Sequence, residues 1–239
     1  MDAILPYLPF LLGGISVTLQ ITFAAIALAV PVAFVLAAGR MSRWAPARWG
    51  AGFVIETFRG TSAVVQLFWA FYVLPFFGIN LSPMVCGILV LGLNEGSFFS
   101  EVVRASLKSI PPGQREAAAA LHLPGFYTFR RVILPQALPV MVPPFGNALV
   151  LMLKFSALVS LVTIQDLTFR AGLITTSIGR SGEVYGIVLV IYFVMALALA
   201  AAVMVLEYYV NRAAGRDVGA LRSFFSGGRS TVPAWAFWR

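Results

Sequence analysis

Charge is scarce in this sequence. Of its 239 residues only 11% are charged, and 60% are hydrophobic, whereas an ordinary soluble domain carries about a quarter charged residues. A water-soluble globule of this size needs far more polar surface than these residues can supply. Lipid is therefore the predicted solvent, and the apolar segments leave no stretch long enough for a separate soluble domain.

Cysteine and histidine are almost absent, each occurring once, as Cys86 and His122. A single cysteine cannot form an internal disulfide or a cysteine-rich metal site. A single histidine leaves a His-based metal cluster without its ligands. The sequence therefore predicts no metal site.

The sequence is instead rich in long apolar segments. A hydrocarbon core about 30 Å thick needs a helix of roughly 20 apolar residues, and five segments are long enough. They cover about residues 11–38, 52–77, 84–107, 136–162 and 185–210. The fold prediction is an all-α integral membrane protein with five transmembrane helices.

The positive charges indicate how these helices are oriented. Thirteen of the 17 Lys and Arg residues fall in or beside the first loop, the third loop and the C-terminal tail. Loops rich in Lys and Arg stay in the cytoplasm, so the N-terminus is predicted outside and the C-terminus inside. This distribution accounts for the net charge of +8 without invoking nucleic acid as a partner.

The third loop, residues 108–135, reads as an ordered hairpin. Pro112 suits the first turn of a helix, residues 114–123 are strong helix formers, and Pro124-Gly125 breaks the chain. A second short helix is predicted over residues 126–133. The residues alone leave two interpretations open, an amphipathic hairpin lying against lipid headgroups or a docking element for a cytoplasmic protein.

The same loop carries a resemblance to a known family. Glu116-Ala117-Ala118, followed at the matching distance by Leu134-Pro135, resembles the EAA loop of ABC-importer permeases, EAA-x3-G-x9-I-x-LP. His122 stands where that motif has glycine, the residue that most readily adopts a positive φ.

The resemblance extends over about residues 10–212. Within the family, the chain resembles the polar amino acid uptake branch, and the stretches FRGTSAVVQLFWAFYVL (58–74) and SLVTIQDLTF (160–169) are most similar to ectoine/hydroxyectoine permease subunits. The resemblance implies the MetI-like type I permease fold, with a transmembrane domain over 1–212 and a cytoplasmic tail over 213–239. It also implies a multi-pass protein of the bacterial inner membrane.

The resemblance further implies an ATP-driven importer of a small zwitterionic solute, either a polar amino acid or a compatible solute such as ectoine. The implied partners are a cytoplasmic ABC ATPase dimer, a second permease chain, identical or different, and an extracytoplasmic solute-binding protein. No GxxxxGK[ST] pattern occurs in the chain. ATP and magnesium are therefore expected on the partner ATPase, and this chain is not expected to be an enzyme.

Eight residues of the hairpin are expected to couple the permease to the ATPase: Glu116, Ala117, Ala118, Ala120, Leu121, His122, Arg130 and Arg131. Residues 116–123 would form the coupling helix. Glu116 would be its polar anchor, the alanines its close-packed face, and the two arginines its flanking contacts.

Polar groups within apolar spans are costly and usually face the bundle interior. Two pairs at helical spacing are predicted to be structural: Glu56 with Arg59, and Glu101 with Arg104. The solute-path candidates are Asn94, Glu95, Asn147, Lys154 and Ser156, although a Glu95–Lys154 bridge could equally be structural. The alternative function is an ion-coupled secondary transporter of a small polar solute.

Overall fold

The structure is a computed structural model of the chain, and it describes residues 5–215. Every element in that range is helical. The elements are, in order, η1 (Leu5–Tyr7), α1 (Leu8–Arg40), α2 (Ala45–Gly60), α3 (Ala63–Phe68), η2 (Trp69–Val73), η3 (Leu74–Phe77), α4 (Pro83–Lys108), α5 (Pro112–Ala120), α6 (Gly125–Thr128), η4 (Phe129–Ile133), α7 (Leu134–Phe155), η5 (Ser156–Val162), α8 (Leu167–Ile178) and α9 (Ser181–Ala213). The predicted tail falls outside the described residues from 216 onward.

Four stretches are long and apolar enough to cross a membrane: Leu8–Arg40, Pro83–Lys108, Gly125–Val162 and Ser181–Ala213. They contain four of the five predicted spans. The remaining one, residues 52–77, was expected as one uninterrupted helix, and that expectation is wrong. The structure divides it into Ala45–Gly60 and Ala63–Phe77, which meet at 103°. The described chain therefore has four spans, or five if this bent pair counts as one.

The break in the second span has a local and a tertiary cause. Thr61 and Ser62 are both extended, with ψ of 151° and 133°, so α2 cannot continue. The carbonyl of Phe58 that the break frees accepts hydrogen bonds from Asn94 Nδ2 (2.9 Å) and Gln66 Nε2 (3.0 Å). A broken helix is tolerated at membrane depth only when its backbone groups find such partners.

Small residues bring α1 and α4 together. Ala25, Ala29 and Ala33 form one fully buried stripe on α1. Opposite this stripe, a methyl group on Gly92 would lie 3.1 Å from the Ala25 carbonyl oxygen, and one on Gly96 would lie 3.1 Å from the Ala29 carbonyl oxygen. Small residues allow this close approach of membrane helices. The α1–α4 pair forms the framework on which the other helices pack.

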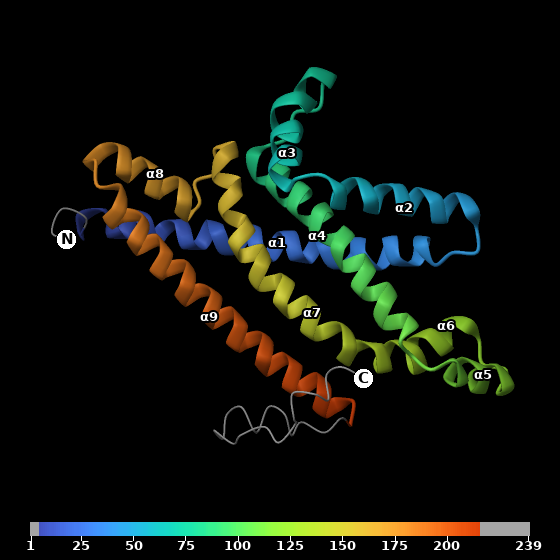
Figure 1. The fold of residues 1–239 in the computed structure, drawn as a ribbon. Coiled ribbons are helices and arrows are strands. Elements are labelled where there is room, and N and C mark those ends of the chain that lie inside the picture. Colours follow the sequence, from blue (N-terminus) through green and yellow to red (C-terminus); the bar gives the residue numbers. More distant parts are fainter. Residues whose placement is uncertain (1–4, 216–239) are drawn as a thin grey trace, which may run out of the picture.

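The remaining helices are arranged around that pair (Figure 1). The hairpin of α5 and α6 lies at the end of the bundle where α1 passes into α2, and α8 lies at the opposite end beside the start of α1. Residues 63–77 project away from α1. The predicted coupling loop and the first loop are thus at one end, and α8 is at the other.

Gly14 is expected to be essential for the packing of α8 on α1. An added methyl group there would lie 2.7 Å from Leu167 Cα and 2.8 Å from its nitrogen, and backbone cannot move aside. We expect Gly14→Ala to lower the free energy of unfolding by about 2 kcal/mol. The measurement is the unfolding temperature in detergent, which should fall. Gly50→Ala, within α2, is the matched control, because no other group lies within 4 Å of its added methyl group. Equal destabilisation by the two variants would contradict this packing.

Candidate functional site: a coupling hairpin and an intramembrane cavity

The hairpin begins with a helix that proline starts and a left-handed residue ends. Pro111 is extended and α5 starts at Pro112. After Ala120 the chain turns at His122, with φ of 51°, and the N–H groups of His122 and Leu123 donate to the carbonyls of Ala119 (2.9 Å) and Ala118 (3.0 Å). This is a Schellman ending, which usually has glycine at the left-handed position. His122 therefore adopts the backbone conformation that glycine favours.

The structure places the eight predicted coupling residues on two sides of the hairpin. Ala118 is buried at 4% exposure, so it packs against this chain and is unavailable to a partner. The other seven are exposed: Glu116, Ala117, Ala120, Leu121, His122, Arg130 and Arg131. The helix also spans 112–120 instead of the predicted 116–123. Seven of the eight predicted coupling residues therefore lie on the exposed surface of the hairpin, and Ala118 does not.

Two side-chain contacts that were not predicted join α5 to the spans. Arg115 Nη2 donates to the Leu107 carbonyl at the end of α4 (3.1 Å), and Gln136 Nε2 at the start of α7 donates to Gln114 Oε1 (3.2 Å). Beneath the hairpin lies a cavity of about 450 Å³ whose lining includes Arg115, Leu107 and Phe34. One hydrogen bond thus joins α5 to α4 and another joins it to α7, and the cavity lies beneath the hairpin.

Of the two predicted structural pairs of charged residues, one is formed and the other is not. Glu101 and Arg104 contact each other, with Arg104 Nε 2.8 Å from Glu101 Oε2. Glu56 instead lies 3.9 Å from Arg40 on α1, where Gly52 leaves room for that side chain. Arg59 lies over the ring of Phe98, 5.2 Å from its centre. The predicted Glu56–Arg59 pair is therefore not formed, because α1 supplies a nearer cation.

A second cavity, of about 410 Å³, lies where the broken second span meets α4 and α7. Its lining includes Thr61, Asn94, Glu95, Phe98 and Ala148. Glu95 is 4% exposed and makes no hydrogen bond or ion pair with any described residue. Asn94 is bound to Phe58 and also donates to Gln66 Oε1 (3.0 Å). The cavity thus contains one fixed amide and one carboxyl group that is available to a ligand.

The other solute-path candidates do not line this cavity. Asn147 and Lys154 are exposed and, seven residues apart on α7, share a face next to the stripe of cavity-lining residues. Ser156, the first residue of η5, is fully buried and donates to the Leu153 carbonyl in the last turn of α7 (2.7 Å). The structure therefore brings Asn94 and Glu95 together, and it forms no Glu95–Lys154 ion pair.

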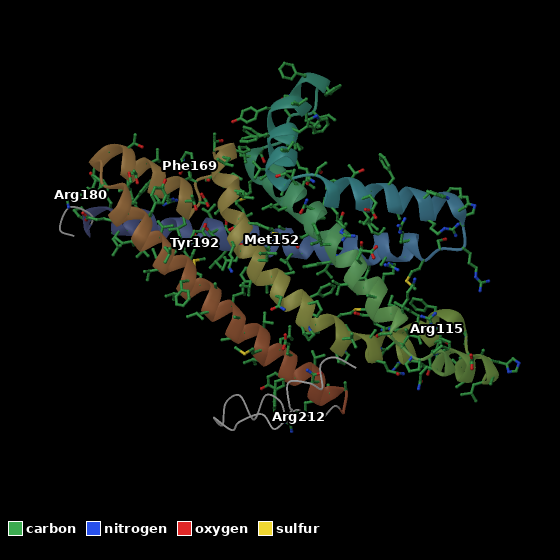
Figure 2. The ribbon with its side chains drawn as sticks, viewed as in Figure 1. Arg115, Met152, Phe169, Arg180, Tyr192 and Arg212 are labelled. Carbon is green, nitrogen blue, oxygen red and sulfur yellow. The ribbon has the colours of Figure 1, made fainter. Side chains whose placement is uncertain are left out.

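A polar cluster holds the opposite end of the bundle. Asp166, fully buried, caps α8 by accepting from the Phe169 N–H (2.8 Å). Tyr192 of α9 donates to its other carboxylate oxygen (3.4 Å), and Thr18 of α1 accepts from the Leu167 N–H (3.2 Å). Figure 2 shows Phe169 and Tyr192 at this end, with Arg180 far from Arg115. The cluster joins three helices at the outer end of the predicted topology.

Arg170, in the same region, is turned inward. Its guanidinium donates to the Phe10 carbonyl (2.7 Å) and lies over the Phe10 ring. It therefore ties α8 to the start of α1. The contacts of Asp166 include no cationic side chain, since this guanidinium is bound elsewhere.

Acidification is expected to stabilise this outer cluster. Burial raises the pKa of Asp166 from 3.8 to about 6, although hydrogen bonds from Phe169, Thr168 and Tyr192 lower it. A raised folded-state pKa means that its contribution to stability is complete below pH 4 and is lost as the pH rises through 6. The full difference amounts to about 3 kcal/mol, of which about 1.4 kcal/mol is lost between pH 5 and pH 7.5.

The measurement is the unfolding temperature of the detergent-solubilised protein at pH 5 and pH 7.5. Wild type should lose more stability over this interval than Asp166→Asn, which keeps an N-cap side chain but does not titrate. All other titrating groups are common to both proteins. Parallel pH profiles would contradict the role given to Asp166.

Comparisons with known proteins agree on one family. A family model described as "Binding-protein-dependent transport system inner membrane component" matches residues 8–216. A probable amino-acid ABC transporter permease of Sinorhizobium fredii is 39% identical over 86% of this chain and 89% of its own length. The L-cystine transport system permease protein of Bacillus subtilis is 36% identical over 68% of this chain and 70% of its own.

Solved structures give the same result. The crystal structure of an amino acid ABC transporter with histidines has a chain that is 34% identical, with a TM-score of 0.80 over 86% of this chain and 96% of that one. An inward-facing methionine ABC transporter structure contains a chain of the same fold, at 23% identity and a TM-score of 0.71 over 86% of this chain and 98% of that one.

Proposed function

The chain belongs to the family of inner membrane components of binding-protein-dependent transport systems, and from this premise we propose that it carries a small zwitterionic solute inward, powered by a separate ATPase. It is a multi-pass membrane protein of the inner membrane. The observation that carries the proposal is the α5–α6 hairpin, with exposed Glu116 and Leu121 on one side and Arg115 bound to the spans on the other.

In this proposal the hairpin lies in the cytoplasm and the N-terminus lies outside. The support is the Lys and Arg distribution in the sequence, together with the position of the hairpin at the same end as the first loop (Figure 1). The ATPase dimer, with its ATP and magnesium, grips the exposed side of α5. Arg130 and Arg131 flank that contact. When the ATPase dimer closes, it moves the hairpin, and the hydrogen bonds of Arg115 and Gln114 transmit this movement to α4 and α7.

The remaining partners follow from the family. The importer needs a second permease chain, the same or different, to complete the path. An extracytoplasmic binding protein delivers the solute to the outer end, where α8 and the start of α9 lie. The tail from residue 213 onward is assigned to the cytoplasmic side.

The solute is proposed to be an amino acid or a close zwitterionic relative. Relatives more than 30% identical are named for amino acids, which favours this class. Glu95 and Asn94 in the cavity, with Asn147 and Lys154 on the neighbouring face of α7, are the proposed contacts along the path. Ectoine and hydroxyectoine are included in the proposal because residues 58–74 and 160–169 resemble ectoine/hydroxyectoine permease subunits.

The test is uptake by vesicles containing the purified permease–ATPase complex and its binding protein. Labelled arginine, histidine, glutamine, glutamate and ectoine are supplied in turn. The proposal expects uptake of at least one of them that requires internal ATP and persists when the proton gradient is collapsed. Uptake that follows the gradient and ignores ATP would instead establish the ion-coupled secondary transporter.

A further inference from the structure

The cavity beneath the hairpin of α5 and α6 has an almost entirely apolar wall. Its volume is about 450 Å³, and among the described residues that line it only Arg115 and Thr128 are polar. The wall extends inward to Val103, which is fully buried. Ala38 of α1 and Phe129 of the hairpin also line it and are exposed. The apolar wall therefore continues from the interior of the chain to its surface.

This cavity lies where two membrane-spanning helices end. Met41 directly follows α1, Leu107 is the last residue but one of α4, and both line the cavity. Phe34, another lining residue, is seven positions before Met41 and so about 10 Å further along α1 toward the middle of the span. Figure 2 shows Arg115 where α4 meets the hairpin. The cavity thus has an apolar part along the spans and a guanidinium at their end.

The Arg115 guanidinium has donors to spare. A guanidinium carries five N–H groups, and the one recorded hydrogen bond of Arg115 within residues 5–215 joins Nη2 to the Leu107 carbonyl (3.1 Å). No ion pair joins Arg115 to a carboxylate in that range. A phosphate group can accept two parallel hydrogen bonds from a guanidinium. An anion can therefore bind Arg115 while the hydrogen bond to α4 is kept.

We propose that this cavity binds an anionic phospholipid of the surrounding bilayer, with one acyl chain along the apolar wall and the headgroup phosphate on Arg115. Basic pockets between transmembrane helices bind anionic headgroups in this way. A soluble anion has no chain to cover the apolar wall, whereas a membrane lipid supplies the chain and the charge together. The inference goes beyond the proposed function, because it depends on neither the solute nor the ATPase.

A bound lipid would hold the hairpin against the spans. The cavity lining comes from α1, α4 and the hairpin, and side chains that face empty space lose packing contacts. An acyl chain in the cavity would restore such contacts to all three parts at once. The lipid would therefore stiffen the hairpin, which two hydrogen bonds, those of Arg115 and Gln136, join to α4 and α7.

The test uses the full-length chain in phosphatidylcholine vesicles that contain a trace of photoreactive lipid. The trace is either phosphatidylglycerol, which is anionic, or phosphatidylcholine, whose choline offsets the phosphate charge, each with the photoreactive group in one acyl chain. After irradiation, mass spectrometry of peptides locates the attached lipid. In wild type both lipids should label residues 34–41 and 119–133. Phosphatidylglycerol should label them about fivefold more, the preference that one cationic side chain confers at a membrane surface.

Two variants separate the chain site from the headgroup site. Ala38→Phe fills the cavity from α1 and should remove the labelling of residues 119–133 by both lipids. Its matched control is Ala27→Phe, at an exposed position of the same helix outside the cavity lining. Arg115→Gln should keep the labelling and lose the preference for phosphatidylglycerol, and Arg115→Lys should keep part of it. Arg48→Gln, at an exposed position of α2, is the control for charge and should keep the preference.

A merely structural role for Arg115 would change labelling by the two lipids equally and leave their ratio as it is. The inference is overturned if the two lipids label residues 119–133 equally in wild type, if Arg115→Gln keeps the preference, or if Ala38→Phe leaves the labelling unchanged. Ala119→Leu, which fills the cavity from α5, repeats the blocking test in case Ala38→Phe does not fold. The assay contains no ATP or solute, so its result is independent of the uptake test of the proposed function.

Discussion

Replacing Glu116 with arginine and Leu121 with glutamate is expected to abolish co-purification of the ATPase while membrane insertion is unchanged. Both residues are exposed, Leu121 at 72%, and the Glu116 side chain makes no hydrogen bond or ion pair with another residue between 5 and 215. The double variant reverses one charge and places another where an apolar side chain stood, so a partner would meet unpaired charges. A buried unpaired charge at an interface costs several kcal/mol, which corresponds to at least a hundredfold loss of affinity.

The matched control is Ser177→Arg, which adds a charge to an exposed position of α8 at the other end of the bundle. It should retain the ATPase in full. Ala118 is unsuitable for this test, because it is buried in the chain itself and a large residue there would disturb the hairpin. Full recovery of the ATPase with the double variant would refute the docking surface.

Replacing Arg115 with methionine is expected to separate ATP hydrolysis from transport. The substitution keeps an unbranched apolar side chain in the cavity but removes the guanidinium, which donates to the Leu107 carbonyl. The hairpin then keeps its exposed surface and loses its attachment to α4. We expect the ATPase to co-purify normally while the amount of solute imported per ATP hydrolysed falls about tenfold, measured in vesicles.

Arg115→Lys, which retains a donor, should recover part of the coupling, and Arg43→Met in the first loop should behave as wild type. A merely structural role for Arg115 would lower the amount of folded complex without changing the ratio of solute to ATP. An unchanged ratio in Arg115→Met would show that movement reaches the spans by another route.

Much of the fold could be predicted from the sequence because lipid imposes a length on apolar segments. That constraint located three spans to within four residues at each end and placed the fourth, 136–162, inside the longer helical stretch Gly125–Val162. It did not reveal the break at Thr61 and Ser62, because the apolar run continues across it and the partners of the freed Phe58 carbonyl come from Asn94, 36 residues away. A hydropathy profile along the chain cannot reveal a contact between residues so far apart in the sequence.

The sequence contains local signals for α8. Asp166 precedes a helix of 12 residues that ends before Gly179, in the left-handed conformation at φ 69°. An N-cap acid and a terminal glycine at that spacing are a helix signature. A helix of 12 residues is too short to span the membrane, so a prediction based on the length of apolar segments does not include it.

The candidate sites show where reasoning from spacing fails. Two pairs with the same i, i+3 spacing were predicted to interact, and only Glu101 and Arg104 are in contact. Glu56 reaches Arg40 because Gly52 leaves space for a neighbouring helix, which no pattern within α2 discloses. The left-handed turn at His122 was predictable from the glycine position of the motif. The helix bounds of 112–120, and the inward position of Ala118, depended on the packing of α5 against the spans.

The most direct measurement of the central claim is the sidedness of the hairpin. Cys86 is buried and is the chain's single cysteine, so a Cys86→Ser background with Leu121→Cys gives one reactive thiol. A membrane-impermeant maleimide should label it in inside-out vesicles stripped of the ATPase, fail to label it in intact cells, and be blocked when the ATPase is bound. Labelling from the outer face of intact cells would contradict a permease whose hairpin is driven by a cytoplasmic ATPase.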